Sequence, residues 1–356
     1  MRIVAVHLLN DYSGSPKVLM QLLKGWSKKG LEVHLFTSST RDGFLSYITK
    51  VQYHFFWYKL AENPYLRLVY LLYSQIVLCL KLLFFLKHND TVYVNTVLPF
   101  GATLAAKLRG IKVIYHIHET SMKPQLLKKF LFAWVDFCAY KAIYVSNYLK
   151  DKESAARKTN FVLYNAIPQD FYEVAVAHRK NLFDRTNILM ICSLKIYKGV
   201  HEFLSLSSVL PHYKFRLVVN ASQEEIEQFF YNFSIPSNLT IYPVQQNTHP
   251  FYSWADLVLN LSHTDKWVET FGLTVIEAMS YGLPVIVPPV GGIAELVANG
   301  ENGYCVDSQD ENTLKNKVIE ILENPHVFDH MHQNNLSKIH EFNEDNFIEK
   351  SLKLIV

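Results

Sequence analysis

Cysteines are few in this sequence, and they lie far apart. The four residues are Cys79, Cys138, Cys192 and Cys305, and no two of them form a C-x-x-C pair. A disulfide framework or a cysteine-based zinc site requires closer grouping, so we predict neither and expect a reducing cytoplasm. The chain also has no D-x-D triplet, the carboxylate pair that often binds divalent metals. No metal site is therefore predicted.

A strong net charge is also missing. Lys and Arg number 35 against 32 Asp and Glu, which gives a net charge of +3 with neutral histidines. This balance does not predict a nucleic-acid partner. Hydrophobic residues make up 49% of the 356 residues and charged residues 19%, which supplies enough apolar material for full cores. The length favours two domains.

Long uninterrupted hydrophobic runs are rare. Met1–Val6 is too short for a secretory signal and is typical of a first buried strand. The most apolar stretch, Leu68–Leu86, contains Ser74, Gln75 and Lys81. A transmembrane helix needs about 20 almost uncharged residues, so we expect a buried or membrane-surface helix here, with a true span as the alternative.

Short β-branched segments alternate with helical stretches along the whole chain. Val18–Lys29, for example, has a helical pattern and is followed by Gly30, which ends it. Such alternation predicts parallel sheets with helices on both faces, the doubly wound α/β architecture. The expected strands are 3–6, 31–36, 91–94, 112–117, 142–145, 187–192, 215–220, 239–242, 257–261 and 284–287.

The strand pattern starts again after residue 186. Tyr164–Pro168 interrupts the first series, and a polar, basic stretch precedes the new strand. We therefore predict a linker within 166–186 between two Rossmann-like domains that face each other across a cleft, where ligands commonly bind. The predicted N-terminal domain is 1–166 with a C-terminal helix over 343–356, and the second predicted domain is 167–342.

Two glutamates eight positions apart give the strongest functional signal. Glu269 precedes a predicted helix that starts near Leu273, and Glu277 lies inside this helix. The N–H groups of Phe271, Gly272 and Leu273 would then lie at a helix N-terminus, which favours an anion such as a diphosphate. Carboxylates beside it suit sugar and ribose hydroxyls. The alternative is an exposed loop glutamate followed by an ordinary helical one.

The flanking sequence favours the functional interpretation. A strand within Trp254–Ser262 leads into the motif, the helix ends at Gly282, and another Gly-rich turn follows at 290–292. With these neighbours the sequence resembles the retaining nucleotide-sugar glycosyltransferases of the GT-B fold, in particular glycosyltransferase family 4. The resemblance extends over nearly the whole chain and is most specific from about residue 254 to 307.

This resemblance implies that domain 1–166 is the acceptor-side domain and that domain 167–342 binds the nucleotide-sugar donor. It also implies roles for the motif. Glu269 would contact the transferred sugar, and Glu277 would bind the ribose hydroxyls. The backbone of Phe271, Gly272 and Leu273 would approach the sugar and phosphates. Contacts to the base are expected around 243–246, which includes Val244, and would come largely from backbone groups.

A second family element lies at 192–199, where C-S-L-K-I-Y-K-G stands in place of the family pattern G-R-L-x-x-x-K-G. Lys198 matches the lysine that neutralises the donor diphosphate, whose negative charge grows in the transition state. Cys192 replaces the usual glycine and Ser193 the usual arginine. We expect Lys195 to supply the second positive charge. An ordinary surface lysine is the alternative for Lys198.

The first domain carries weaker matches. Gly14 corresponds to one of two family glycines near donor and acceptor, although a simple structural turn explains it equally well. His118 follows the strand 112–117 and matches the family histidine near sugar and acceptor. A structural histidine, or metal ligation together with His116, is the alternative. The basic, aromatic segment 123–134 fits either an anionic membrane surface or an ordinary half-buried helix.

The resemblance therefore implies a retaining, metal-independent glycosyltransferase of the hexosyltransferase type, without a cofactor. It implies a location in the cytoplasm, with membrane association at the inner face as the alternative to a freely diffusing protein. The expected donor is a UDP-sugar, with GDP-mannose as the alternative. The expected acceptor is a glycan or lipid-linked glycan in bacterial surface polysaccharide synthesis, such as lipopolysaccharide or capsule. The alternatives on the same scaffold are a sugar-nucleotide epimerase, a phosphorylase, or a non-catalytic sugar-nucleotide binding protein.

Overall fold

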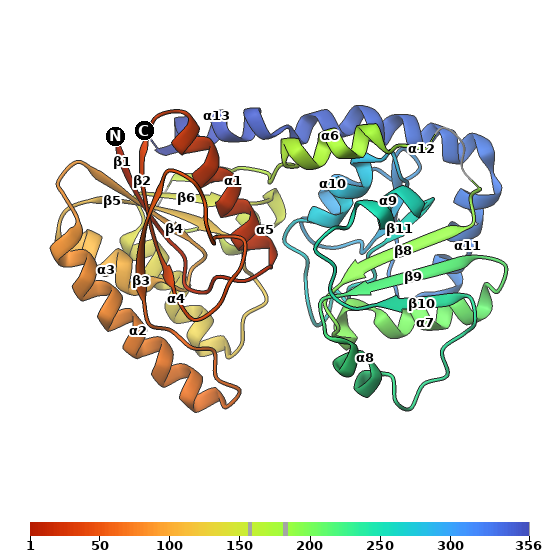
Figure 1. Cartoon of the computed structure of the whole chain (residues 1–356), viewed down its shortest axis with the longest axis horizontal. Helices are drawn as coiled ribbons and strands as arrows, with labels where there is room; N and C mark the ends of the chain where they lie inside the picture. Colours follow the sequence, from red (N-terminus) through yellow and green to blue (C-terminus); the bar gives the residue numbers. More distant parts are fainter. Residues whose placement is uncertain (156–158, 181–183, 356) are drawn as a thin grey trace. The chain divides into compact units, whose positions relative to one another are not determined.

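The computed structural model describes residues 1–155, 159–180 and 184–355. The chain divides into two compact units: unit 1 comprises Met1–Asn165 and Glu344–Val356, and unit 2 comprises Ala166–Asn343. Each unit is a parallel sheet with helices packed against it (Figure 1). Two such sheets confirm the predicted doubly wound α/β fold class.

Unit 1 contains a seven-stranded sheet in the order β3-β2-β1-β4-β5-β6-β7, with all neighbours parallel. Its central strand β4 is buried at every position, as expected for a strand covered on both faces. The strands are β1 Arg2–Val6, β2 Glu32–Ser38, β3 Val51–Phe56, β4 Asp90–Asn95, β5 Lys112–Ile117, β6 Lys141–Tyr144 and β7 Thr159–Val162. The helices are α1 Gly14–Lys28, α2 Pro64–Phe85, α3 Phe100–Leu108, α4 Gln125–Cys138, α5 Asn147–Glu153 and α13 Glu344–Ile355.

Unit 2 contains a six-stranded sheet in the order β10-β9-β8-β11-β12-β13, again parallel throughout. Its strands are β8 Asn187–Cys192, β9 Lys214–Val219, β10 Leu239–Tyr242, β11 Leu257–Leu259, β12 Val285–Val287 and β13 Gly303–Cys305. Its α-helices are α6 Gln169–Ala177, α7 Val200–Val209, α8 Gln223–Phe229, α9 His249–Trp254, α10 Leu273–Ser280, α11 Glu311–Glu323 and α12 Pro325–Lys338. Its 3-10 helices are η1 Ile196–Lys198, η2 Ala294–Leu296 and η3 Ile339–Phe342.

Three strands were not predicted, and all three lie at sheet edges: β3, β7 and β13. Edge strands are short or half-exposed, so they lack the continuous apolar run that marks a central strand. The predicted linker 166–186 is wrong in part, because it contains α6. Phe171 of α6 packs on His249 at 4.2 Å between ring centroids, which makes this helix part of unit 2. Residues 181–183 of the predicted linker lie outside the described residues.

The last helix, α13, packs in unit 1. Trp26 of α1 donates its indole N–H to Ser351 Oγ at 2.9 Å. Gly25 allows the close approach, since a Cβ at this position would lie 2.4 Å from Ile348 Cδ1. The polypeptide therefore leaves unit 1 after residue 165, forms unit 2, and returns to complete a layer of unit 1.

Candidate functional site

Lys198 is positioned by a tight turn after β8. The strand ends at Cys192, and η1 follows before α7 begins. Between η1 and α7, Gly199 has φ +77°, and a Cβ there would lie 2.2 Å from the carbonyl oxygen of Leu261. Glycine satisfies both the backbone angle and the close approach, which explains the K-G pair of the sequence.

Lys198 and Glu269 contact each other directly. The Lys198 ammonium donates to Glu269 Oε1, and Ser262 Oγ donates to the same oxygen at 2.9 Å. The Trp267 ring centroid lies 5.2 Å from the ammonium, and this ring stacks on Tyr197. Lys198 and Glu269, which lie 71 positions apart in the sequence, thus form an ion pair. The Ser262 hydroxyl and the Trp267 ring contact this pair and help to hold it in place.

A glycine-rich turn supports the backbone of Glu269. The Gly292 N–H donates to the Glu269 carbonyl oxygen at 2.8 Å. Gly291 has φ +117°, and a Cβ here would lie 2.5 Å from the same oxygen. A side chain at Gly291 would push the turn away from the Glu269 backbone. The Gly-rich turn at 290–292 therefore helps to position Glu269 and, with it, the carboxylate of this residue.

The helix that carries the second glutamate, α10, begins at Leu273. Gly272 directly precedes it, and a Cβ there would lie 2.7 Å from Ile293 Cγ1. The Phe271 side chain is buried and packs near Phe342, so this residue can offer its backbone rather than its ring to a ligand. The first N–H groups of a helix have no partner inside it and carry partial positive charge. The Glu269 segment therefore leads into a helix N-terminus, which is the kind of backbone arrangement that suits an anion.

Glu277 is buried within α10 and hydrogen-bonded. Tyr252 of α9 donates its hydroxyl to Glu277 Oε2 at 2.7 Å, and Tyr252 itself is fully buried. Burial and the neighbouring carboxylate raise the pKa of Tyr252 well above its usual value, so the hydroxyl remains a donor. The sequence analysis did not identify Tyr252 or Ser262, because neither belongs to a motif and each reaches its glutamate through the fold.

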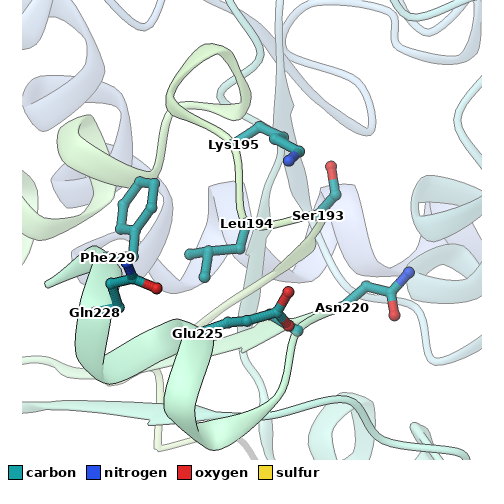
Figure 2. Close-up of a pocket in the computed structure, with 8 residues that line it drawn as sticks. Ser193, Leu194, Lys195, Asn220, Glu225, Gln228 and Phe229 are labelled. Carbon is teal, nitrogen blue, oxygen red and sulfur yellow. The ribbon is translucent and has the colours of Figure 1, made fainter. Parts of the chain in front are cut away.

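A cavity of about 270 Å³ lies between the loop after β8 and helix α8 (Figure 2). Ser193 and Lys195 line one side, and Glu225, Gln228 and Phe229 line the other. The lining residues are Ser193, Leu194, Lys195, Asn220, Ala221, Glu225, Gln228 and Phe229. Among the predicted donor residues of unit 2, Ser193 and Lys195 thus line this cavity, whereas Lys198 pairs with Glu269.

Cys192 and Val244 have distinct surroundings. Burial raises the pKa of the Cys192 thiol to about 12, while nearby Lys198 acts in the opposite direction. The thiol is therefore neutral and unreactive at physiological pH. Val244 follows β10, is exposed, and donates its N–H to the Ala221 carbonyl oxygen at 3.0 Å. Its side chain is thus accessible while its N–H is already engaged.

The other two predicted residues, His118 and Gly14, lie in unit 1. Asn95, at the end of β4, connects His118 with the turn at Gly14. The His118 ring nitrogen Nε2 donates to Asn95 Oδ1 at 2.9 Å, since an amide oxygen only accepts. The Asn95 amide group donates to the Ser15 carbonyl oxygen at 3.0 Å, in the first turn of α1 that Gly14 opens. Asn95 therefore links His118 to the Gly14 turn, and the sequence analysis missed it.

His118 is electrically neutral in this setting. Burial lowers its pKa well below the usual value, and the neighbouring His116 and His7 lower it further. The hydrogen bond to Asn95 keeps the proton on Nε2 and leaves Nδ1 as an acceptor. The His116 and His118 rings do lie together, with centroids 4.3 Å apart. Within the described residues, no group of three or more His, Cys, Asp or Glu could hold a metal ion.

Glu119 directly follows His118 and was not assigned a role from the sequence. Burial raises its pKa to about 7, although hydrogen bonds from backbone N–H groups, among them that of His118, partly offset this effect. A carboxyl group with this pKa exchanges its proton near neutral pH.

Two family profiles match consecutive parts of the chain. The profile described as Glycosyltransferase Family 4 matches residues 12–168, and the profile described as Glycosyl transferases group 1 matches residues 176–338. All the predicted residues of unit 2 lie within the second match.

Curated relatives cover different shares of the chain. N-acetyl-alpha-D-glucosaminyl L-malate synthase of Bacillus anthracis is 24% identical over 350 residues, which covers 92% of this chain and 89% of that protein. Sucrose-phosphate synthase 4 of Arabidopsis thaliana is 37% identical over 75 residues. That shorter match spans 21% of this chain and only 7% of the length of the plant protein.

Solved structures share the fold. Anabaena HepE in complex with UDP-glucose superposes with a TM-score of 0.79 at 18% identity, over 99% of both chains. WaaG, a glycosyltransferase involved in lipopolysaccharide biosynthesis, gives a TM-score of 0.74 at 13% identity, over 100% of both chains. Together, the two doubly wound sheets and these matches define a glycosyltransferase of the GT-B fold. The chain thus combines a region that matches glycosyltransferase family 4 with a region that matches the glycosyl transferases group 1.

Proposed function

We propose that this glycosyltransferase moves a sugar from a nucleotide-diphosphate sugar to a glycan or lipid-linked acceptor, with retention of configuration at the anomeric carbon. The contact between Lys198 and Glu269, next to the start of α10, carries the proposal. It combines a cation and a helix N-terminus for a diphosphate with a carboxylate for sugar hydroxyls. The HepE complex with UDP-glucose supports a UDP-sugar as donor, and GDP-mannose is the second candidate.

In the proposed reaction, the bond between the anomeric carbon and the diphosphate oxygen breaks while the acceptor oxygen bonds to the same face of the sugar. The acceptor hydroxyl gives its proton to the departing phosphate oxygen. Negative charge grows on the diphosphate, where Lys198 and the first N–H groups of α10 stabilise it. Glu269 would then bind sugar hydroxyls, and Glu277, oriented by Tyr252, would bind the ribose.

The remaining predicted residues have supporting roles in this proposal. Lys195 would supply the positive charge that the family arginine provides at the position of Ser193. The neutral His118, held by Asn95, would accept a hydrogen bond at Nδ1 from a sugar or acceptor hydroxyl. Because these groups provide the charge that the leaving group needs, we propose a metal-independent reaction without a cofactor, which would continue in EDTA.

We further propose a role in bacterial surface polysaccharide synthesis, such as lipopolysaccharide or capsule, in the cytoplasm at the inner face of the membrane. The fold shared with WaaG supports this assignment. An acceptor on a lipid carrier would bring the enzyme to an anionic surface, where the exposed Lys123 and Lys129 of segment 123–134 would help to bind.

A thermal-shift screen with UDP-, GDP- and ADP-sugars tests the donor. A ligand that binds the native state at about 100 times its Kd adds about 2.7 kcal/mol to the unfolding free energy, so the matching donor raises the Tm by a measurable amount. Lys198→Met should abolish this shift and lower kcat by about 100- to 1,000-fold. Lys214→Met, an exposed lysine at the start of β9, is the control. Absence of a shift with every nucleotide sugar would contradict the proposal.

The serine at position 193 favours a second candidate, a protein that binds a nucleotide sugar without transferring it. Such a protein would show the same thermal shift but would release no nucleoside diphosphate with any acceptor. An epimerase would convert the donor sugar without an acceptor, so product analysis with donor alone separates it from a transferase.

A further inference from the structure

Helix α2 of unit 1 has an apolar face that is exposed to solvent. Leu72 is the least exposed member of this face at 47%, and Phe84 is the most exposed at 91%. The residues repeat at helical spacing and so form one stripe along the helix. We call this stripe the α2 outer face: Val69, Leu72, Tyr73, Ile76, Leu80 and Phe84. Figure 1 shows α2 on the outside of unit 1, next to α3.

The opposite face of α2 already supplies the contacts that the fold needs. Gln75 Oε1 accepts the Gly101 N–H of α3 at 2.9 Å. A Cβ at Gly101 would lie 2.1 Å from the Gln75 carbonyl oxygen, so the two helices are in close contact. The buried residues of α2 are Leu71, Ser74, Gln75, Leu78 and Leu82. The outer face is therefore not needed to build the core of unit 1.

An exposed apolar stripe of this length requires a partner. A surface helix normally carries polar residues on the side that faces water, and large apolar patches mark interaction sites. Among the described helices, α2 is the one long and apolar enough to cross a membrane. A single span through the bilayer would place Ser74 and Gln75 in hydrocarbon, whereas both lie buried in unit 1. The geometry therefore favours a helix that lies on a membrane, with one face in the protein.

The charges around the stripe favour an anionic surface. Between residues 51 and 89 the chain has four basic residues and one acidic residue, Glu62. All four basic side chains are exposed: Lys59, Arg67, Lys81 and Lys87. A second copy of this chain would bring two such basic margins together, which costs energy, whereas anionic headgroups would neutralise them.

Aromatic residues at the margin fit the same partner. Trp57, which follows β3 and is 41% exposed, packs edge-on against Tyr73 with ring centroids 5.7 Å apart. Tyr65 in the first turn of α2 is 82% exposed. Tryptophan and tyrosine favour the boundary between headgroups and acyl chains, because one part of the ring system is apolar and another is polar.

The basic, aromatic segment 123–134 offers less for membrane binding. Its central cation, Lys128, is bound to Glu153 at 2.5 Å, and Glu153 also accepts from Thr120. Leu126 and Phe130 are its exposed apolar residues. The α2 outer face has more exposed apolar side chains.

We propose that the α2 outer face docks unit 1 on the surface of a bilayer that contains anionic lipids. The apolar side chains enter the boundary between headgroups and acyl chains, and the four basic residues remain among the headgroups. This docking goes beyond sugar transfer and requires neither a donor nor an acceptor. It can therefore fail while the transfer reaction stands, and the reverse also holds.

Vesicle flotation tests the proposal with the full chain. The vesicles contain phosphatidylcholine alone or phosphatidylcholine with 30% phosphatidylglycerol, about a third anionic lipid as in a strongly charged leaflet. The test variant carries Ile76→Glu and Phe84→Glu, two exposed changes to a good helix former. The control carries Val209→Glu and Tyr231→Glu in unit 2, which are also exposed and change the net charge equally.

Wild type and control should float with anionic vesicles, and the test variant should bind at least 10-fold more weakly with an unchanged circular dichroism spectrum and Tm. Neutral vesicles should bind wild type more weakly than anionic ones. Equal binding by the test variant and wild type would overturn the proposal. So would a wild-type chain that ignores all vesicles but dissociates from dimer to monomer when Ile76 and Phe84 are changed, because a second copy would then cover the face.

Discussion

At the scale of single residues, the partners of the two glutamates matter as much as the glutamates themselves. Glu277 is buried, and a buried carboxylate without good hydrogen bonds is costly. Tyr252 supplies one of these bonds and so orients the Glu277 carboxylate. An identical glutamate without this hydroxyl would bind the ribose less well.

We therefore predict that Tyr252→Phe weakens nucleotide binding about 10-fold, since the loss of one hydrogen bond to a charged group costs about 1.5 kcal/mol. Isothermal titration with the nucleoside diphosphate measures the effect. Tyr231→Phe, an exposed tyrosine in the same unit, is the matched control. An unchanged Kd in Tyr252→Phe would show that Tyr252 does not act through Glu277.

Glu119 predicts a pH effect on stability. Its pKa is raised by burial from 4.5 to about 7, so the folded protein holds this proton over a pH range where the unfolded chain has lost it. The stabilisation is complete below about pH 4.5 and is lost as the pH rises through 7, by at most about 1.4 kcal/mol per pH unit. Glu119→Gln should remove this contribution.

The difference in unfolding free energy between wild type and Glu119→Gln, measured by urea denaturation from pH 5 to 8, reports on this group alone. The buried His7 and His116 act in the opposite direction, because burial lowers their pKa values to about 4 and about 3. Their contribution is lost as the pH falls below 6.5, and it cancels in the difference. A difference that is independent of pH would contradict the prediction, and Glu62→Gln, which is exposed, serves as control.

The sequence predicted residues that belong to local motifs and missed those that act through the fold. The pairs Glu269–Glu277 and Lys198–Gly199 have fixed sequence spacings, and the turns beside them require glycine. They can therefore be recognised from the sequence alone. Asn95, by contrast, comes from a different strand from His118. Its contact depends on β4 and β5 lying side by side, which no local pattern contains.

At the scale of elements, glycines fix the turns that carry the site. Gly199 combines a positive φ with a close approach to the Leu261 carbonyl oxygen, whereas Gly300 has φ +81° and open space around it. A comparison of substitutions at these two glycines separates the free-energy cost of a positive φ from the cost of a steric clash. Both residues lie in unit 2, so the same transition reports on both variants.

We predict that Gly300→Ala destabilises unit 2 by about 1–2 kcal/mol, the cost of a side chain at positive φ. Gly199→Ala should cost at least about 2 kcal/mol more and should also weaken nucleotide binding, because the turn that positions Lys198 must move. Urea midpoints and thermal shifts with the donor measure the two effects. Equal stability losses in both variants would mean that the turn relaxes freely around Leu261.

The long central strands and the helices between them could be predicted because their apolar runs are continuous. β5 and β8 match the predicted ranges residue for residue. α6 could not be predicted, since Ala175 is its one buried residue and Val174 and Val176 are exposed, so no apolar face marks the helix in the sequence. It is held by packing on α9 through Phe171. Tertiary contacts rather than local propensity decide such segments.

At the scale of the whole molecule, the chain passes twice between the two units. Its last helix, α13, is a structural layer of unit 1, in contact with α1 through Ile348 and Ser351. Damage at the end of the sequence should therefore weaken the part of the protein that the beginning of the sequence forms.

We predict that Ile348→Asp destabilises unit 1 by about 3 kcal/mol or more, because it places a charge in a buried contact with Gly25. Hydrogen exchange measured by mass spectrometry should show faster exchange in β1, β2 and β4 and unchanged exchange in β8 and β9. Lys350→Asp, on the exposed side of α13, is the control. Equal acceleration in both units would contradict an effect confined to unit 1.

The return of α13 also affects how the protein is made. Ribosomes release a chain from its N-terminus, and domains generally begin to fold as they emerge. The first 165 residues emerge early, but the residues of α13 that contact Trp26 and Gly25 are translated only after all of unit 2. During synthesis, the growing chain therefore carries an unfinished apolar surface on α1, which chaperones would have to shield until the last codons have been read.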